Sequence, residues 1–402
     1  MRLMFLSASG QLGGAETSLL EVIASLRQAE PSWPLCVLSA GEGPFNDRAA
    51  ALGATTVTLP FPRSVAQLGE SGAVAGGGWP GFAAHAVCAA PSAAAYLGRV
   101  RRAIRDFAPD VLHTNGLKMH VLGAFTRSAP ALVWHVHDYL GTRPLSARLL
   151  RWNRARCAAV IANSSSVAAD ARQVLGEVNV VTVLNGVDLT RFSPVGPRLD
   201  LDRLAGLAPV APGTVRVGLL ATFARWKGHT TFLHALTRMP PTLPIRAYVI
   251  GGPLYETDGS QYTRQELMNL VTDLGIGDRV GFTGIVAEPD AALRSLDIVV
   301  HASTAPEPFG LVIAEAMACE RAVIVSAAGG AAEMITDCVD AVGHTPGDAD
   351  ALASRIVGLA TDAEWRARIA RAARATAVRS FDRTRLAADL VPLYRQVAGG
   401  CR

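Results

Sequence analysis

The chain has 402 residues, half of them hydrophobic, and a formal net charge of +4 from 38 basic and 34 acidic side chains. This length suits about two domains with substantial cores, and the near balance of charge argues against a dedicated nucleic-acid binder. No stretch reaches the roughly 18 uninterrupted apolar residues of a membrane span, so we expect no transmembrane helix. The six cysteines are scattered without a CxxC or zinc-type spacing, which favours reduced thiols in a cytoplasmic protein.

Short apolar runs rich in β-branched residues alternate with helix-like segments along the whole chain. Most of these runs lack the strict alternation of a strand with one solvated face, so they indicate strands buried on both faces, as in parallel sheets. Strands are expected, in chain order, at residues 2–7, 34–39, 55–60, 110–114, 132–136, 158–163, 179–185, 215–221, 246–252, 279–284, 297–302 and 321–327. The predicted fold class is α/β, with two Rossmann-like doubly wound domains.

Prolines mark the break between two series of strands. Four of them fall close together just before a new strand begins at Val215. We therefore expect a first domain over residues 1–187 and a second over residues 188–380. Within the first domain, the segment 64–96 is rich in Gly, Ala and Ser, and we expect a long loop that is functional or mobile.

Two glutamates, Glu307 and Glu315, stand at the ends of the apolar run EPFGLVIAE. We expect a strand that ends near His301, then a loop, then a helix that starts near Phe309 or Gly310. The free N–H groups of a helix start form an anion site, aided by the helix dipole. A carboxylate can accept hydrogen bonds from sugar hydroxyls. A carboxylate, a phosphate cradle and a second carboxylate in this order suit a nucleotide sugar.

The segment from Glu307 to Glu315 resembles the E-x7-E motif of glycosyltransferase family 4. Further likenesses follow the family's order along the chain, at GQLGGAET (10–17), VLNGVDLTRFSP (183–194), WKGH (226–229) and VSAAGGAAEMI (325–335). These four segments resemble the family's N-terminal glycine loop, its inter-domain segment, its lysine-glycine donor loop and the stretch that follows the E-x7-E helix.

The resemblance implies the GT-B fold, which has two Rossmann-like domains with an inter-domain cleft. It also implies that the C-terminal helix, 381–402, crosses back to complete the first domain. Members of the family are retaining enzymes that use nucleotide-activated sugars without a metal. By the same resemblance, Glu307 faces the donor sugar and Glu315 holds the ribose. The backbone amides expected near the sugar and the diphosphate are those of Phe309, Gly310 and Leu311.

A glycine pair, Gly13 and Gly14, follows the first strand and precedes a helix expected from near Ala15. Glycine lets a ligand approach the backbone, and by the resemblance this loop lies under the diphosphate and beside the acceptor. A plain tight turn is the alternative. The GxGxxG spacing is absent, which weakens the case for an NAD-dependent oxidoreductase.

Histidines gather at strand ends, where the ligand crevice of such sheets lies: His113, His135, His137 and His301. His137 occupies a position at which the family often has a histidine that reaches the donor sugar, so we predict a catalytic role for it. His135 is expected on the opposite face of the same strand. Each histidine alone is more often structural, and no carboxylate or cysteine accompanies them at metal-ligand spacing.

Basic side chains follow the first strand of the second domain. Lysine binds a phosphate as a point charge, and arginine binds it with two parallel hydrogen bonds. We therefore predict that Lys227 and Arg225 bind the diphosphate and stabilise it as the leaving group. The family's usual arginine position, counted back from Lys227, holds Thr222 in this chain. Arg225 is the expected substitute, and a solvated basic loop is the alternative. Gly284, at the end of a later strand, completes the predicted donor-binding set.

Five arginines occur in the segment RPLSARLLRWNRARC, residues 143–157, which indicates a basic and partly amphipathic helix. Such a helix can contact anionic lipid headgroups at the inner surface of a membrane. A solvated face on a core-packed helix is the favoured alternative.

We predict a hexosyltransferase-type, retaining glycosyltransferase. It would move a sugar from a nucleoside diphosphate sugar, with UDP as the expected nucleotide, to a hydroxyl of a glycan, a lipid or a small molecule. We expect no cofactor and no metal, since the DxD-like segments 200–202 and 348–350 fall in loop or helix-start contexts. The rivals are a nucleotide-sugar epimerase or a phosphorylase on the same fold, and a nucleotide-sugar-binding regulatory protein without turnover.

Overall fold

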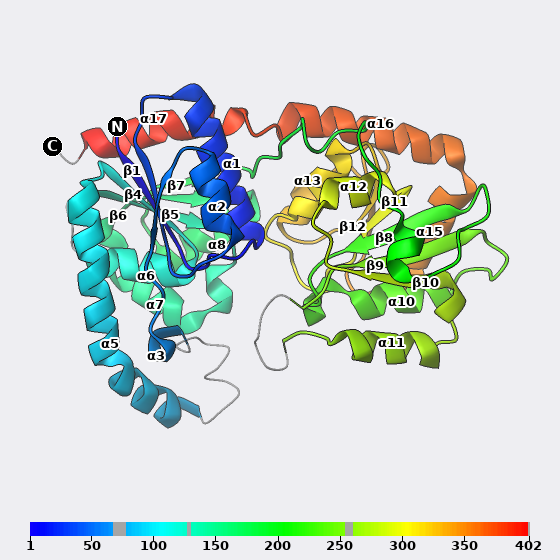
Figure 1. The fold of residues 1–402 in the computed structure, drawn as a ribbon, viewed down its shortest axis with the longest axis horizontal. Helices are drawn as coiled ribbons and strands as arrows, with labels where there is room; N and C mark the ends of the chain where they lie inside the picture. The colour runs from blue at the N-terminus through cyan, green and yellow to red at the C-terminus, as the bar shows by residue number, and fades with distance from the viewer. Residues whose placement is uncertain (67–77, 127–129, 254–259, 401–402) are drawn as a thin grey trace. The chain divides into compact units, whose positions relative to one another are not determined.

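The structure is a computed structural model that describes residues 1–66, 78–126, 130–253 and 260–400, with side chains from Cys88 onward in the helix that starts at Gly78. The chain folds into two compact units. Unit 1 comprises Met1–Gly186 and Arg383–Arg402, and unit 2 comprises Val187–Asp382. Each unit is an α/β fold with a parallel sheet and helices packed against it (Figure 1).

Unit 1 is built on a seven-stranded sheet in the order β3-β2-β1-β4-β5-β6-β7. Its strands are β1 (Leu3–Ser7), β2 (Leu35–Ser39), β3 (Thr55–Thr58), β4 (Val111–Asn115), β5 (Ala131–Val136), β6 (Cys157–Ala162) and β7 (Val180–Thr182). All residues of β1, β2, β4 and β5 are buried. The continuous apolar runs of the sequence therefore correspond to strands that are covered on both faces.

Helices cover both faces of this sheet. Alternate residues of β1 show the division, because Leu3 and Phe5 face one core and Met4 and Leu6 face the other. The first core includes residues of α1 (Gly14–Ala29), α2 (Pro44–Ala51) and α17 (Arg385–Gly399), and the second includes residues of α5 (Gly78–Phe107), α6 (Leu117–Thr126), α7 (Pro144–Trp152) and α8 (Ser165–Leu175). The short helix α3 (Arg63–Ala66) and the 3-10 turns η1 (Leu140–Thr142) and η2 (Arg154–Arg156) complete the unit.

Unit 2 is built on a six-stranded sheet in the order β10-β9-β8-β11-β12-β13. Its strands are β8 (Val215–Leu220), β9 (Ile245–Ile250), β10 (Val280–Gly284), β11 (Ile298–His301), β12 (Ala322–Ser326) and β13 (Val342–His344). Its helices are α9 (Leu201–Ala205), α10 (His229–Thr237), α11 (Arg264–Asp273), α12 (Pro289–Arg294), α13 (Leu311–Ala318), α14 (Gly330–Glu333), α15 (Ala349–Thr361) and α16 (Ala363–Ser380), with 3-10 turns η3 (Arg225–Lys227) and η4 (Gly277–Arg279).

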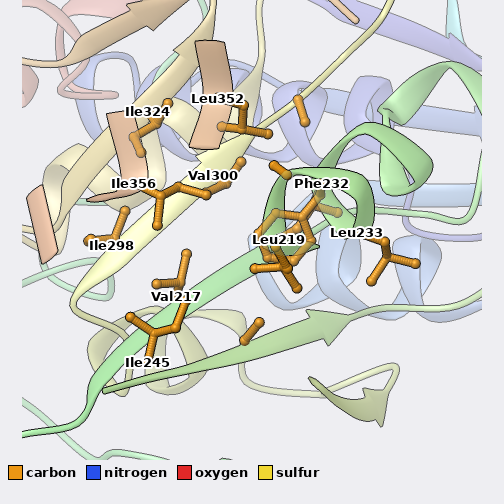
Figure 2. Packing of buried hydrophobic residues seen from close by; sticks show 14 of the residues in the cluster. Val217, Leu219, Phe232, Leu233, Ile245, Ile298, Val300, Ile324, Leu352 and Ile356 are labelled. Atoms are coloured by element: carbon orange, nitrogen blue, oxygen red, sulfur yellow. The ribbon is translucent and has the colours of Figure 1, made fainter. Parts of the chain in front are cut away.

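The core of unit 2 fixes where its strands end. Val217 of β8 and Val300 of β11 point to the same face of the sheet, where Phe232 of α10 and Leu352 and Ile356 of α15 cover them (Figure 2). All five side chains are at most 1% exposed. Because this packing sets the register of β8 and β11, it also sets where the connections that leave their carboxyl ends begin.

One expectation about the fold is wrong, and one strand was not predicted. The segment 64–96 is not one long loop, because α5 begins at Gly78 and continues with Pro91 inside it; residues 67–77 lie outside the described ranges. The strand β13 is absent from the expected set, since its three residues, VGH, are too few to show a pattern. The twelve expected strands are confirmed with small shifts at their ends.

The C-terminal helix α17 belongs to unit 1. Its predicted apolar face is confirmed, because Leu386, Leu390, Leu393 and Val397 are buried in the core that contains β1. Tyr394 is also buried, and its hydroxyl lies 2.8 Å from Nδ1 of a histidine in β4. In the described part of the chain, no helix is both long and apolar enough to cross a membrane.

Candidate active site

The strand order of unit 2 reverses between β8 and β11, which lie side by side. In open parallel sheets, ligands bind outside the carboxyl ends of the strands at such a reversal. Lys227 stands in the connection after β8, and Glu307 in the connection after β11. The topology therefore brings to one edge of the sheet two residues that are 80 positions apart in the chain.

Lys227 and Glu307 form an ion pair at this edge. The Lys227 Nζ atom lies 2.8 Å from Oε1 and 2.8 Å from Oε2 of Glu307, so the ammonium donates to both oxygens. The lysine side chain is 21% exposed and the glutamate side chain 9%. At such burial, removing one partner leaves a charge that is poorly solvated, which is costly.

Two more side chains bind the Glu307 carboxylate. Ser303 Oγ donates to Oε2 at 2.7 Å, and His301 Nε2 lies 3.2 Å from the same oxygen. Ser326 Oγ donates to the backbone carbonyl of Ser303 and so holds its segment in place. Burial acts to raise the pKa of Glu307, but Lys227 and His301 outweigh it and hold that pKa well below its usual range. Glu307 is therefore an anion at physiological pH.

The helix after Glu307, α13, begins at Leu311, so the expected start at Phe309 or Gly310 is early by one or two residues. Gly310 caps the helix with φ 95°, a left-handed conformation that favours glycine, and a Cβ there would come within 2.7 Å of the Ile313 side chain. The Phe309 side chain is 2% exposed and packs edge-on against Phe381. The first N–H groups of α13 have no partner within the helix, and the contacts of the Phe309, Gly310 and Leu311 amides with a donor stay predictions.

Glu315 and Gly284, two further predicted donor-binding residues, lie at separate places in unit 2. Glu315 is half-buried within α13, between buried neighbours. Gly284 ends β10, two strands from β8 in the sheet, and has φ 76°. Their contacts with ribose and donor stay predictions.

Arg225, the predicted second phosphate ligand, forms an ion pair away from the Glu307 carboxylate. Its Nη2 lies 2.9 Å from Glu266 Oε1, and its guanidinium stands 4.3 Å from the centre of the Tyr262 ring. Both side chains of the ion pair are 45% exposed. Exposed pairs contribute little to stability, so Arg225 can exchange Glu266 for a phosphate at small cost. Its role at the diphosphate stays a prediction.

Sequence reasoning missed Ser303 and underrated Gly228. A Cβ on Gly228 would come 1.8 Å from the carbonyl oxygen of Ala302, so only glycine lets the connection after β8 lie against the end of β11. Ser303 follows His301 by two positions at a strand end, and residues two apart in a strand point to the same side. This spacing is the signal in the sequence from which their shared contact with Glu307 follows.

Unit 1 has its own reversal of strand order, between β1 and β4. The helix after β1 begins at Gly14 with Gly13 as its N-cap, close to the expected start. Glu16 in the first turn is buried, and its Oε1 accepts a hydrogen bond from Ser7 at 3.2 Å. Burial raises the pKa of Glu16, although hydrogen bonds from its own N–H, from Ser7 and from the N–H of Gly13 oppose the rise. The amides of the glycine loop are thus partly occupied by a side chain of the same turn.

His137 follows β5 at the same edge of the unit 1 sheet. Its Nε2 lies 2.6 Å from Asn115 Oδ1, and Asn115 Nδ2 donates to the carbonyl of Ala15 at 3.1 Å. The expectation that His135 points to the opposite face is wrong, because the two imidazole centres are 4.0 Å apart. Positions two apart share one face of a strand, so the two rings belong together.

Three buried histidines of unit 1, His113, His120 and His135, and the half-buried His137 are neutral at physiological pH. Burial, with a smaller contribution from His137, lowers the pKa of His113 and His120 to about 3, and burial lowers that of His137 to about 4. Burial likewise holds the pKa of His135 well below 6.5, and within the described residues neither of its ring nitrogens has a hydrogen-bond partner.

The acidic DxD-like segments have structural contacts. Asp200 and Asp348 cap the starts of α9 and α15. Asp202 accepts a hydrogen bond from the Tyr248 hydroxyl at 2.7 Å and pairs with Arg216. Across the described ranges, no three His, Cys, Asp or Glu side chains are grouped so that they could hold a metal ion.

Comparison with known families agrees with the motifs. Residues 12–191 match the family model described as Glycosyltransferase Family 4, and residues 212–376 match the one described as Glycosyl transferases group 1. The chain belongs to glycosyltransferase family 4. It is 33% identical over 257 residues to a D-inositol 3-phosphate glycosyltransferase of Xylanimonas cellulosilytica, covering 59% of this chain and 58% of that protein. A protein of the same name from Mycobacterium tuberculosis is 32% identical over 241 residues, covering 56% and 47%. The chain spans about half the length of the curated relatives that it matches.

Similar solved structures extend over the whole chain of this family 4 protein. Anabaena HepE, solved in complex with UDP and glucose, is 28% identical with a TM-score of 0.78, covering 98% of this chain and 99% of HepE. The HepE complex with UDP-glucose is 27% identical with a TM-score of 0.77, covering 100% and 99%. Sucrose-phosphate synthase from Thermosynechococcus elongatus, 19% identical with a TM-score of 0.78, covers 100% of both chains and shows the fold alone. The predicted α/β class and GT-B fold are confirmed.

The neutral histidines predict that unit 1 loses stability in mild acid. Their pKa values in the folded protein lie below 6.5. Their contribution to the stability of the folded protein is therefore fully present above pH 6.5 and is lost as the pH falls towards about 4. Below pH 6.5 such a histidine binds a proton in the unfolded chain but not in the folded protein. Each one therefore lowers the free energy of unfolding by about 1.4 kcal/mol for every pH unit of acidification. Urea unfolding should be measured for wild type and for His135→Leu between pH 7 and pH 4.5. The slope of the free energy of unfolding against pH should be smaller in His135→Leu, by the contribution of about one proton. An unchanged slope in His135→Leu would contradict the assignment.

The placement of the basic residues after β8 predicts a graded loss of nucleotide affinity. A charge-assisted hydrogen bond contributes about 1.5–3 kcal/mol, so Lys227→Ala and Arg225→Ala should each raise the dissociation constant of UDP by about 10- to 150-fold. Thr222→Ala should raise it far less, because a hydroxyl offers one neutral donor. Calorimetry at one salt concentration measures the dissociation constant of UDP for all three variants. Lys227→Arg is the matched control, because it keeps the positive charge that pairs with Glu307. If Thr222→Ala raises the dissociation constant of UDP strongly while Arg225→Ala leaves it unchanged, Arg225 does not bind the diphosphate and is only a surface partner of Glu266.

Proposed function

We propose that this protein is a retaining glycosyltransferase. It moves a sugar from a nucleoside diphosphate sugar, with UDP as the expected nucleotide, to a hydroxyl of a glycan, a lipid-linked acceptor or a small molecule. The observation that carries the proposal is the Lys227–Glu307 pair beside the start of α13, at the strand reversal of unit 2. The HepE complexes with UDP and with UDP-glucose support the choice of nucleotide.

In this proposal the chemistry is mainly electrostatic. When the bond between sugar and diphosphate breaks, negative charge grows on the leaving phosphate. Lys227, the first N–H groups of α13 and, after it leaves Glu266, Arg225 would stabilise that charge without a metal. The leaving phosphate would take the proton of the acceptor hydroxyl, since the sugar is delivered to the face that it leaves.

Glu307 would orient the donor sugar rather than exchange protons with it. As an anion it offers its oxygens only as hydrogen-bond acceptors, and its low pKa makes it a poor acid. Ser303 and His301 hold Oε2, while Lys227 spans both oxygens. A diphosphate that attracts Lys227 would therefore free part of the carboxylate for sugar hydroxyls. His137 stays a predicted catalytic residue.

The rivals keep the same nucleotide but predict other products. An epimerase would change the sugar of UDP-glucose with no acceptor present, a phosphorylase would need inorganic phosphate, and a regulatory protein would bind without turnover. A screen of nucleotide sugars by thermal shift, followed by a crystal soak with the best ligand, tests the proposal. Failure of every nucleoside diphosphate sugar to shift the unfolding temperature would contradict it.

The proposal includes a cytoplasmic location with contact at the inner face of a membrane. The acceptor class that would bring the protein there is a lipid-linked one.

The two glutamates should separate binding from turnover. Glu315→Ala should weaken the binding of UDP, because the ribose that Glu315 is predicted to hold is present in the donor and in the product alike. Glu307→Gln should leave UDP affinity unchanged or higher, because Lys227 loses its competing partner, while transfer from the donor that the screen selects falls steeply. Calorimetry with UDP and a turnover assay distinguish the two variants. Wild-type behaviour of both in both assays would refute the assignment.

Metal independence is the second consequence. Transfer should persist in excess EDTA, because amides and basic side chains neutralise the diphosphate in this proposal. The matched measurement adds magnesium or manganese after chelation. If chelation stops transfer and either ion restores it, the proposed charge stabilisation is wrong.

A further inference from the structure

The outer face of α7 carries two large apolar side chains. Trp152 is 80% exposed and Leu149 is 40% exposed. Trp152 follows Leu149 by three positions and Arg148 by four, so the three share one helical face. The inner face of α7 is already satisfied, because Ala147 and Leu150 are buried. A core-packed helix with a merely solvated outer face would have polar residues in place of Trp152 and Leu149.

The segment that contains α7 and the following turn η2 is also strongly basic. The segment 143–157 has no Asp or Glu and five arginines: Arg143, Arg148, Arg151, Arg154 and Arg156. The four from Arg148 onward are exposed, whereas Arg143 lies 3.9 Å from Asp138 in an exposed pair.

The elements that pack against α7 do not neutralise this charge. They are α6, α8, η1 and η2. Lys118 is the charged residue of α6, and α8 carries Asp170 and Arg172, which balance. The carboxylate of Asp170 accepts hydrogen bonds from the backbone of η1.

We propose that this surface, the α7 face, docks on an anionic lipid bilayer. It consists of Arg148, Leu149, Arg151 and Trp152 of α7 with Arg154 and Arg156 of η2. Arginines near a bilayer are attracted to its negative surface, and each contributes about fivefold to binding. Tryptophan is favoured at the level of the headgroups, where its ring is in apolar surroundings and its N–H meets water. The face combines both requirements of an interfacial helix.

A lipid surface fits this face better than other anionic partners. A nucleic acid would neutralise the arginines but would leave Leu149 without apolar surroundings. The net charge of the whole chain, +4, is also small for such a partner. None of the α7 face residues belongs to the candidate active site, so the docking does not depend on the proposed transfer.

Vesicle flotation tests the docking with the full chain. Wild-type protein should float with phosphatidylcholine vesicles that contain phosphatidylglycerol and stay behind with phosphatidylcholine alone. Arg148→Glu combined with Arg151→Glu should lower the partition coefficient by at least about 25-fold, from two lost cations at about fivefold each. The matched control is Arg368→Glu combined with Arg371→Glu, which alters two exposed arginines of α16 at the same spacing. Equal losses in the two double variants would overturn the proposal, because net charge alone would then explain binding.

Tryptophan fluorescence gives an independent readout. Adding anionic vesicles to wild type should shift the emission to shorter wavelength, and Trp152→Phe should abolish this shift while it keeps most of the binding. Trp152→Ser should lose binding that survives in high salt, where the arginine contribution is screened. Unfolding temperature and UDP affinity, measured on every variant, exclude a folding defect. A wild type that fails to float in low salt, or a shift that persists in Trp152→Phe, overturns the proposal, whereas absent UDP binding would count only against the proposed transfer.

Discussion

The Glu307 carboxylate is charged although its side chain is only 9% exposed. Removing a carboxylate from water costs several kcal/mol, and the cost is offset only when donors surround it in good geometry. Lys227, His301 and Ser303 supply those donors from the connections after two neighbouring strands. The order of the strands, the left-handed conformation of Gly228 after Lys227 and the short path from β11 to α13 bring these donors to that one charge.

Lys227 and Glu307 satisfy each other's charge in this structure. Neither charged group therefore faces the protein interior without a partner. In the proposed reaction the diphosphate takes over the lysine, and Ser303 and His301 still hold the carboxylate. The exposed Arg225–Glu266 pair is easier to break than the buried one. In the proposed reaction, Lys227 and Arg225 would thus exchange a carboxylate partner for the diphosphate, rather than leave water to bind it.

The sequence predicts most strands because burial on both faces leaves continuous apolar runs, and it predicts the Glu307 region because strand, loop and helix signals occur in a row. Contacts between distant segments escaped it, as the Glu266 partner of Arg225 shows. The segment 64–96 fails for a compositional reason, since alanine suits helices while glycine and proline suggest loops. The error at His135 has a simpler cause, because the period of a strand puts it on the same side as His137.

The position of α17 has a consequence for the order of events during synthesis. Unit 2 is one continuous stretch, Val187–Asp382, whereas unit 1 needs residues from Arg383 onward. Leu390 and Tyr394 of α17 are fully buried in unit 1, and the Tyr394 hydroxyl meets His113 of β4. The first half of the chain therefore leaves the ribosome with an apolar face that its own neighbours cannot cover. Domains usually fold from the N-terminus onward, but here the later unit has all its residues first, and the earlier one must wait for the last helix to emerge.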